Sequence, residues 1–420
     1  MDNYVVQHLH DDTSNCNGYA DSCTKFDEYI KLAKKCNMKA IAFSNHGGIY
    51  DWVKKKQSCD KNNIKYIHGV ELYLCINLED NIRGWHIGLY SKNWEGVKEL
   101  NTLMALSTSK GSKEDNTDRH MYYNPRISFD ELMHTSSNII ITTACISSPL
   151  WRLGDKEALD KEDGKNIYDY NIGKRNELLE WLSKNSDRCF LEIQYHNHIH
   201  QIEFNKQLYK WSKEYKIPLI SGTDTHSSTQ YKAECRKILQ IAKDSFYGDE
   251  DAFDLTWKTY DELIKSYENQ DALPKEVYME AINNTNKFAD MVEEFTLDKT
   301  FKYPNLYGND ENGQWKTLIK NKLKEKLDKH IIDKRKIKEY KQKINEEYKA
   351  MSGQKMASFM MFMSELMVWC RENDIHSSPC RGSVGGSLIA YITDITDVDP
   401  IVWNTVFSRF CNADRVSLAD

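Results

Sequence analysis

Long apolar runs, CxxC pairs and a secretory leader pattern are all missing from this chain of 420 residues. We find no apolar run of about 18 residues, which predicts no membrane-spanning helix. The eleven cysteines include no CxxC pair. This scattered distribution favours reduced thiols in a cytoplasmic protein. The first residues, MDNYVVQHLHDD, lack the basic and then apolar layout of a signal peptide, which agrees with a cytoplasmic location.

The remaining composition is that of a soluble globular protein with two or three domains, because apolar residues make up 40% and charged residues 29%. The net charge of −6 hides an uneven distribution. Residues 316–349 carry 13 basic and 6 acidic side chains. Such a surplus can face nucleic acid. From charge alone, however, a solvated helix face is the better interpretation.

Short β-rich runs recur through the first half of the chain. Most are separated by stretches that can form a helix, and this alternation predicts a parallel sheet or a barrel. The runs cover residues 4–10, 39–46, 66–76, 85–91, 139–145, 189–196 and 218–226.

Each run contains a possible metal ligand, in most cases at or near its C-terminal end. In a parallel barrel these ends meet at one rim, and two ligands two residues apart on a strand point to the same face. His86, near the start of its run, is the exception. Imidazoles and carboxylates together suit Zn, Mn or Fe, and several such ions can activate water for phosphoester cleavage. The candidates are His8, His10, His46, Glu71, His86, Cys145, His196, Asp224 and His226. Nine candidates predict two or three ions, whereas the alternative is a set of scattered structural histidines.

The order HLH, NHG, GVE, WH, AC, QYH and TDTH resembles the polymerase and histidinol phosphatase (PHP) domain of bacterial replicative DNA polymerases. The resemblance implies a seven-stranded (β/α) barrel in which the nine candidates surround two or three Zn or Mn ions. It departs at one point, because the family often has Asp-Gly after HxH and this chain has Asn17-Gly18. In some relatives the site is a 3′–5′ exonuclease, and in others it is structural.

The second half of the chain is expected to be mostly helical. Residues 231–300 are interpreted as helical and acidic, and the loop at 301–313 is a candidate domain boundary. Apolar residues from Trp315 to Ile331 follow helical spacing and leave lysines on the opposite face. Residues 355–371 are apolar nearly all round, which predicts a buried helix.

The stretch SPCRGSVGGS at 378–387 precedes an apolar run that starts like a helix. A loop of small residues entering a helix N-terminus can offer free N–H groups to phosphate, and Arg381, Ser383 and Ser387 add further donors. An ordinary turn is the alternative, since the Walker ending is missing. Residues 378–420 resemble the palm segment of C-family DNA polymerases, the DNA polymerase III alpha type. The resemblance implies nucleotide binding by Arg381, Gly382, Ser383, Gly386 and Ser387.

In that family, Asp420 corresponds to the first aspartate of a PDxDxD run, so the catalytic aspartates of the polymerase would lie beyond it and remain unknown here. We therefore expect residues 1–290 to form a PHP barrel with trailing helices, and residues 291–420 to begin an α+β palm. The resemblance implies primer-template DNA, dNTPs, other replisome subunits and a C-terminal polymerase fragment as partners, with Mg in the complete polymerase site. It also implies a location in the cytoplasm of a bacterium, or of a host cell for a viral protein. A stand-alone metal-dependent phosphoesterase or 3′–5′ exonuclease and a structural docking module are the alternatives.

Overall fold

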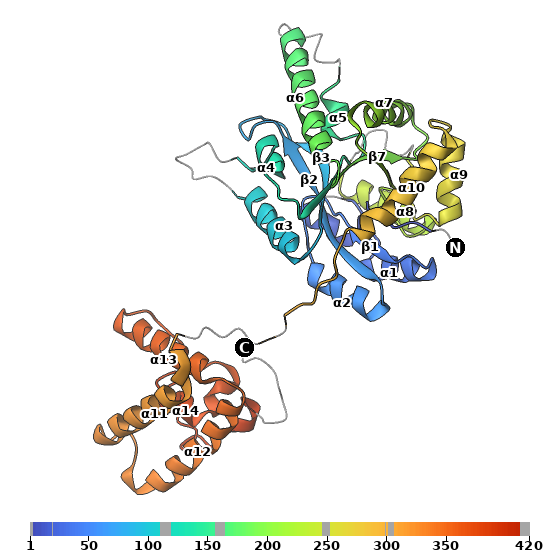
Figure 1. Ribbon diagram of the computed structural model, residues 1–420. Coiled ribbons are helices and arrows are strands. Elements are labelled where there is room, and N and C mark those ends of the chain that lie inside the picture. The colour runs from blue at the N-terminus through green and yellow to red at the C-terminus, as the bar shows by residue number, and fades with distance from the viewer. Residues whose placement is uncertain are drawn as a thin grey trace. The chain divides into compact units, whose positions relative to one another are not determined.

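The computed structural model describes residues 3–18, 20–109, 119–155, 164–245, 253–298, 300 and 306–411. The chain divides into two compact units, Met1–Thr296 and Leu297–Asp420. The first unit contains a curled mixed sheet with helices around it, and the second contains helices (Figure 1).

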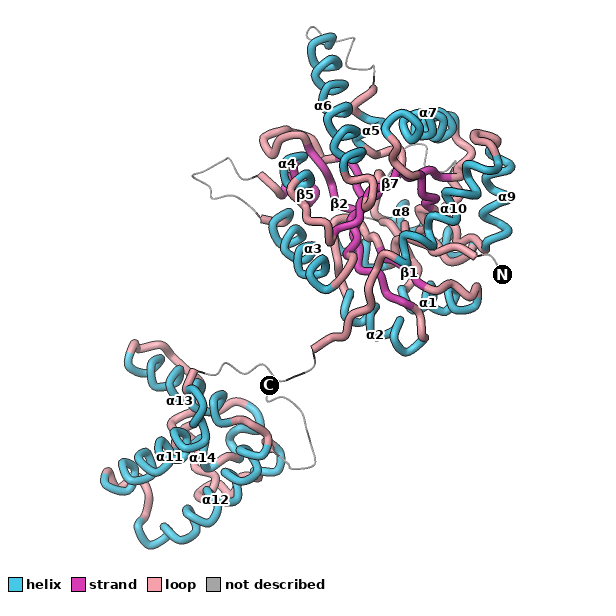
Figure 2. The backbone as a smooth tube through the Cα atoms, in the orientation of Figure 1, coloured by secondary structure: helices cyan, strands magenta, loops and turns pink. Residues whose placement is uncertain are grey.

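The core of the first unit is an eight-stranded sheet with strand order β4-β5-β2-β3-β6-β7-β8, in which β1 also pairs with β2. These strands are short and rich in β-branched and aromatic residues, which favour a pleated buried surface. Figure 2 shows them gathered inside a shell of helices. The strands are β1 (Ala40–Phe43), β2 (Lys65–Cys75), β3 (Trp85–Ser91), β4 (Met121–Tyr122), β5 (Asn124–Ser128), β6 (Ile139–Thr142), β7 (Cys189–Gln194) and β8 (Leu219–Gly222).

The chain segment at residues 4–10 closes this sheet into a ring. It forms a parallel bridge from Val6 to Ile41 on β1 and another from Leu9 to Thr225, just after β8. Backbone hydrogen bonds reinforce both sides, including Ala42 N to Val6 O at 3.0 Å and His10 N to Thr225 O at 2.8 Å. All seven predicted β-rich runs therefore take part in the barrel wall, with the first joined by bridges instead of a continuous ladder.

One strand of the ring runs against the others. β3 is antiparallel to both β2 and β6, whereas β1–β2, β6–β7 and β7–β8 are parallel. The barrel is therefore mixed and not all-parallel. Because β3 is reversed, its N-terminal end lies at the rim where the parallel strands have their C-terminal ends. This direction brings His86, near the start of β3, to the same rim as the other candidates.

Helices cover the outside of the barrel, and their apolar faces pack on the strands (Figure 1). The helix α10 also packs closely against β8 and contributes Phe288 and Ala289 to a buried cluster. The predicted helical character of residues 231–300 is confirmed for the described part by three of these helices. The helices are α1 (Phe26–Lys35), α2 (Trp52–Asn62), α3 (Trp94–Ser107), α4 (Phe129–Met133), α5 (Pro149–Arg152), α6 (Gly164–Lys184), α7 (Ile199–Tyr215), α8 (Gln230–Ala242), α9 (Tyr260–Gln270) and α10 (Lys275–Asp290), with a 3-10 helix η1 at Asp12–Asn17.

The second unit has its own apolar core, built around the fully buried Trp315. Residues 306–411 contain helices and no strand, so the β part of the expected palm is absent from the residues described. The elements are η4 (Gly308–Asp310), α11 (Glu311–Asp328), η5 (Lys334–Lys336), α12 (Ile337–Gly353), α13 (Ala357–Glu372), η6 (Gly382–Gly386), α14 (Leu388–Ile392) and η7 (Phe407–Arg409).

Two details of the predicted helices are wrong. Ile331 was expected on the apolar face of the first helix, but α11 ends at Asp328 and Ile331 is 53% exposed. The helix α13 was expected to be buried on all sides, but Trp369 is 53% exposed and Leu366 is 38% exposed. Only one face of α13, which includes Met360 and Met361, packs into the core. Among the described residues, every helix is too short or too polar to cross a lipid bilayer.

Replacing Trp315 should destabilise the second unit selectively. We expect Trp315→Ala to lower the free energy of unfolding of this unit by about 3–5 kcal/mol, because it removes a large side chain from a packed core. Hydrogen exchange of the α13 and α14 backbone amides, measured in the full chain, reports the change. Trp369→Ala is the matched control, since its exposed ring should contribute within about 0.5 kcal/mol. Equal effects of the two variants would contradict this account of the core.

Candidate metal centre

The side chains of the candidate centre come from chain segments that meet at one rim of the barrel. His8 and His10 lie on the closing segment, two residues apart, and point to the same side of the wall. His46 follows β1 and forms a parallel bridge with Glu71 on β2. Asp224 and His226 follow β8. The barrel therefore gathers residues that are far apart in sequence into one buried cluster.

Glu71 lies at the middle of this cluster, with both carboxylate oxygens facing imidazoles. Its Oε2 is 2.9 Å from His46 Nδ1 and 3.4 Å from His10 Nε2. Its Oε1 is 3.0 Å from His86 Nδ1 and 3.4 Å from His8 Nε2. Glu71 is 1% exposed, so this negative charge is held away from water by the barrel wall.

Asp224 provides a second, partly buried carboxylate. Its Oδ1 lies 3.1 Å from His8 Nε2 and 3.4 Å from His10 Nε2. The backbone of Asp224 has a φ of 45°, in the left-handed region that side-chain-bearing residues seldom adopt. Such strain is concentrated at functional sites, where the surrounding structure holds it in place.

Asp21 is a third carboxylate of the cluster, and the sequence analysis did not identify it. Its Oδ1 lies 3.1 Å from His226 Nε2 and 3.6 Å from His46 Nε2, and its Oδ2 lies 3.5 Å from His10 Nδ1. The family pattern had directed attention to Asn17, four residues earlier. Asp21, in the loop that follows η1, supplies a charged carboxylate to this cluster.

The charges of these groups depend on one another. Burial raises the pKa of Asp21, but His226 and His46 outweigh burial and hold the pKa well below its usual value. Burial lowers the pKa of His10 to about 3, with His226 and His46 adding to the effect. For His46, burial is outweighed by Asp21 and Glu71, and the pKa rises to about 9. The carboxylates are thus ionised in a buried pocket, an environment that attracts cations.

The donor set fits metal ions. Three groups of side chains could each hold an ion, because within each group one ligand atom per residue lies within 4.8 Å of the others. Each pair of groups has one residue in common, which is His10, His46 or Glu71. Within the described chain, His8 Nε2, His10 Nε2 and both oxygens of Glu71 are buried without a hydrogen-bond partner. Buried polar atoms left without partners are costly unless an ion or water satisfies them. The groups are His10, Asp21, His46 and His226; His8, His10 and Glu71; and His46, Glu71 and His86.

Three of the predicted ligands lie outside these three groups, namely Asp224, Cys145 and His196. The contacts of Asp224 are given above, and those of Cys145 and His196 are as follows. Cys145 Sγ is 3.5 Å from His86 Nδ1, and burial together with Glu71 raises the pKa of its thiol well above the usual value. His196 is 1% exposed, and both of its ring nitrogens lack a hydrogen-bond partner among the described residues. Burial lowers the pKa of His196 to about 4, although the charge of Asp224 acts against this shift. Both side chains remain candidates for the edge of the centre.

A buried carboxylate behind the cluster orients His8. Oε1 of Glu192 accepts a hydrogen bond from His8 Nδ1 at 2.6 Å and another from Gln194 Nε2 at 2.9 Å. This bond fixes the ring so that Nε2 points towards Glu71 and Asp224, as carboxylates behind metal-ligating histidines commonly do. Gly222 leaves the space that Glu192 occupies, since a Cβ at this position would lie 1.9 Å from Glu192 Oε1.

Both residues missed by the sequence analysis had a signal in the sequence. Glu192 lies four residues before His196 on an extended run, so strand alternation places both on the same face. Asp21 lies in a loop, where spacing does not predict direction. Only the lack of charge at Asn17 pointed to the need for another carboxylate nearby.

The Gly-Ser loop of the second unit places its five candidate residues in two different environments. Arg381, Gly382 and Ser383 are exposed, whereas Gly386 and Ser387 are buried. A Cβ on Gly386 would lie 2.4 Å from the Val406 carbonyl oxygen, so this position requires glycine.

The expectation of free N–H groups at the start of α14 is wrong for two residues. The buried carboxylate of Glu347 accepts hydrogen bonds from Leu388 N at 2.9 Å, Ile389 N at 3.0 Å and the Ser387 hydroxyl at 3.0 Å. A carboxylate is a favourable partner for a helix N-terminus. The chain therefore supplies its own anion at the point where the sequence analysis expected phosphate.

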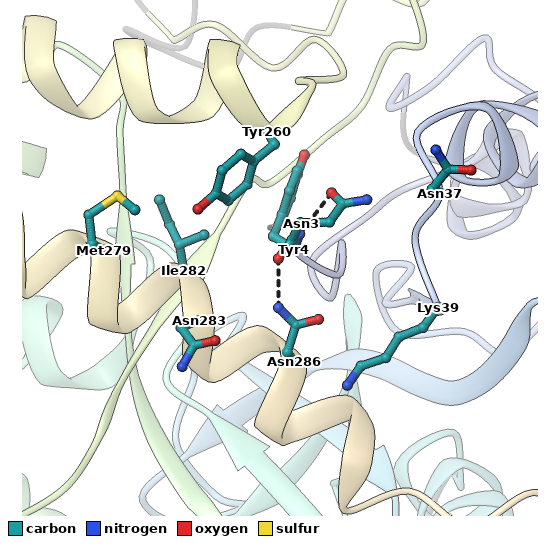
Figure 3. Close-up of a pocket in the computed structure, with 9 residues that line it drawn as sticks. All are labelled: Asn3, Tyr4, Asn37, Lys39, Tyr260, Met279, Ile282, Asn283 and Asn286. Atoms are coloured by element: carbon teal, nitrogen blue, oxygen red, sulfur yellow. Dashed lines mark hydrogen bonds between the residues drawn. The ribbon is translucent and has the colours of Figure 1, made fainter. Parts of the chain in front are cut away.

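A separate pocket of about 490 Å³ opens at the other end of the barrel, near the start of the closing segment and of β1. Figure 3 shows Asn286 pointing to Asn3, beside Tyr4 and Tyr260. Lys39, which lines the pocket, is neutralised by Asp290 at 2.6 Å. None of the candidate metal ligands lines this pocket, so it is distinct from the candidate centre.

Removing the charge of Asp21 should weaken metal binding. We expect Asp21→Asn to reduce the affinity for Mn²⁺ or Zn²⁺ about 10–100-fold, because an ionised ligand is replaced by a neutral amide. Isothermal titration of the metal-stripped full chain measures the change. Asp12→Asn is the matched control, since Asp12 is a half-buried carboxylate on η1 outside the three groups. An unchanged affinity in Asp21→Asn would exclude Asp21 as a ligand.

Comparison with known proteins matches both units to named domains. Residues 7–196 match the PHP domain, and residues 315–420 match the bacterial DNA polymerase III alpha NTPase domain. The chain is 30% identical to the DNA polymerase III subunit alpha of Borreliella burgdorferi, over 99% of this chain and 34% of the relative. It is 27% identical to the subunits of Helicobacter pylori and Aquifex aeolicus, over 100% and 99% of this chain and 35% and 36% of those relatives.

The chain thus spans about a third of the length of the curated relatives it matches. Their similarity extends across both units, including the stretch between the two matched domains. The chain contains a PHP domain followed by a DNA polymerase III alpha NTPase domain, and over its whole length it corresponds to the N-terminal part of DNA polymerase III alpha subunits.

Proposed function

We propose that this chain is the N-terminal portion of a replicative DNA-directed DNA polymerase, acting in the bacterial cytoplasm as part of a larger assembly. The observation that supports this function most strongly is the alignment of nearly the whole chain with DNA polymerase III alpha subunits. Two-metal nucleotide transfer needs carboxylates that hold Mg²⁺. Asp420, where the family pattern begins its aspartate run, lies outside the described residues.

In this proposal the metal centre of the PHP domain gives 3′–5′ exonuclease activity. The nine predicted ligands, together with Asp21, would hold two or three Zn or Mn ions. Such ions supply an activated water and neutralise a phosphodiester. Glu192 holds the ring of His8 in place, so that its Nε2 stays directed into the cluster. The barrel wall excludes bulk water from Glu71 and His10, which strengthens the electrostatic interactions at the rim.

We further propose that the Gly-Ser loop binds the triphosphate of the incoming nucleotide. Arg381, Gly382 and Ser383 are exposed and can contact phosphate oxygens, with Arg381 offering a forked pair of donors. Gly386 and Ser387 are buried and would shape the loop instead of touching the ligand. Glu347 fixes the buried end of the loop through its three hydrogen bonds.

The second unit also carries apolar side chains that suit a partner carrying the rest of a polymerase. Trp403 is 71% exposed, Val402 is 63% exposed and Val406 is 56% exposed. Exposed apolar groups clustered in this way commonly mark protein interfaces. We propose that a C-terminal polymerase segment covers this cluster, with primer-template DNA and other replisome subunits bound by the complete assembly.

A stand-alone phosphoesterase or 3′–5′ exonuclease is the second candidate. It is favoured by one observation, namely that every residue of the three ligand groups belongs to the first unit. The centre therefore needs no side chain from the second unit. A purely structural docking module is the third candidate. In that case the chain should fold without metal and have no nuclease activity.

A nuclease assay distinguishes these candidate functions. We expect the full chain with Mn²⁺ to release nucleotides from the 3′ end of labelled single-stranded DNA. His10→Ala should reduce the rate by at least about 100-fold, because His10 is shared by two ligand groups. His134→Ala, which alters a side chain that is 75% exposed, should retain the activity. Absence of activity in the metal-loaded unmodified chain would favour the docking module.

Polymerisation should require a second polypeptide. We expect primer extension to be absent with the chain alone and to appear when a chain carrying the remaining length of the relatives is added. In the reconstituted enzyme, Arg381→Ala should raise the KM for dNTP about tenfold or more, because it removes a phosphate contact. Arg335→Ala, an exposed arginine paired with Asp333, is the control. Extension that never appears with such a partner would contradict the polymerase proposal.

A further inference from the structure

A groove on the second unit combines an apolar floor with a basic rim. It has a volume of about 610 Å³ and lies between α11, η5 and α12. Leu323, Leu327 and Ile337 form its apolar lining. Lys320, Lys324, Lys334 and Lys341 line it as well, and Asp328 is the one acidic residue among those lining it in the described chain. The volume falls within the range of about 300–1,000 Å³ that is usual for binding pockets.

The lysines of this groove differ from other lysines on or next to α11. Lys322 pairs with Asp394 at 2.7 Å, Lys326 pairs with Asp394 at 2.6 Å, and Lys329 pairs with Glu325 at 2.6 Å. The four groove lysines are exposed and form no ion pair with the described residues. The second unit thus neutralises several of its lysines internally and leaves these four charges available around one apolar depression.

The apolar floor indicates what kind of ligand would fit. A nucleic-acid backbone would satisfy the lysines through its phosphates, but it has no group that gains from contact with Leu323, Leu327 and Ile337. Single-stranded bases are usually held by stacking on aromatic rings, and no aromatic residue lines the groove in the described chain. A peptide with both leucine-like and carboxylate side chains satisfies the floor and the rim together.

We propose that this groove docks an acidic amphipathic helix of a partner protein. Apolar side chains of that helix, spaced three and four residues apart, would enter the groove, and flanking aspartates or glutamates would face the four lysines. The charge complementarity steers the partner to the groove, and burial of the apolar side chains holds it there. The inference is independent of nuclease or polymerase activity.

The test uses the full chain and a fluorescein-labelled peptide made of glutamates, with leucines spaced three and four residues apart. We expect fluorescence anisotropy to show saturable binding. The double variant Lys324→Glu/Lys334→Glu should weaken it at least about tenfold, since attraction at the rim becomes repulsion. Lys338→Glu/Lys349→Glu changes two exposed lysines that do not line the groove, and it should weaken binding much less.

Two further measurements separate a peptide groove from a basic DNA surface. Ile337→Ser should weaken peptide binding about tenfold or more, while thermal melting confirms that the variant remains folded. A peptide with serines in place of the leucines should bind much more weakly than the original. Equal binding of the two peptides would overturn the proposal. A second result would also overturn the proposal. In it, duplex DNA binds in a way that depends on Lys324 and Lys334, while Ile337→Ser leaves peptide binding unchanged.

Discussion

The barrel is closed by one short segment that lies between β1 and the residues after β8, two neighbours that are far apart in the sequence. Residues 4–10 bridge β1 on one side and the chain after β8 on the other. Without these contacts the sheet would have two open edges, and His8 and His10 would have no fixed position. With them, both imidazoles point into a cluster whose carboxylates come from β2, from the turn after β8 and from the loop that holds Asp21. The contacts that close the wall therefore also position these two candidate ligands.

The two units use buried carboxylates in opposite ways. Glu71 in the first unit faces four imidazoles, yet neither of its oxygens has a hydrogen-bond partner among the described residues. Glu347 in the second unit accepts three well-formed hydrogen bonds from the loop that it supports. An unsatisfied carboxylate is costly and indicates a binding site, whereas a satisfied one stabilises local structure. This contrast separates a centre suited to ions from a scaffold for the Gly-Ser loop.

The sequence predicted six of the eight strands, the closing segment and most of the gathered ligands, because these follow from local alternation and from the shared rim of a barrel. The short strands β4 and β5 were not predicted. His86 looked like an exception only because the direction of β3 cannot be read from spacing. Asp21 was missed because a loop has no periodicity, and Glu192 because its partner, His8, is 184 residues away. Glu347 was beyond prediction for a similar reason, since its role depends on the packing of α12 against α14. The exposed side of α13 was mispredicted because apolar composition alone does not say whether a neighbour covers each face.

The bridge between Leu9 and Thr225 has a consequence for synthesis of the protein. The segment that closes the wall is synthesised before its second neighbour, which follows more than two hundred residues later in the chain. Contacts of such high sequence separation form late, because a long loop must close before they gain any energy. Until the residues after β8 have been translated, His8 and His10 cannot contact the carboxylate of Asp224. The full set of candidate ligands is therefore brought together only after the whole barrel has been translated.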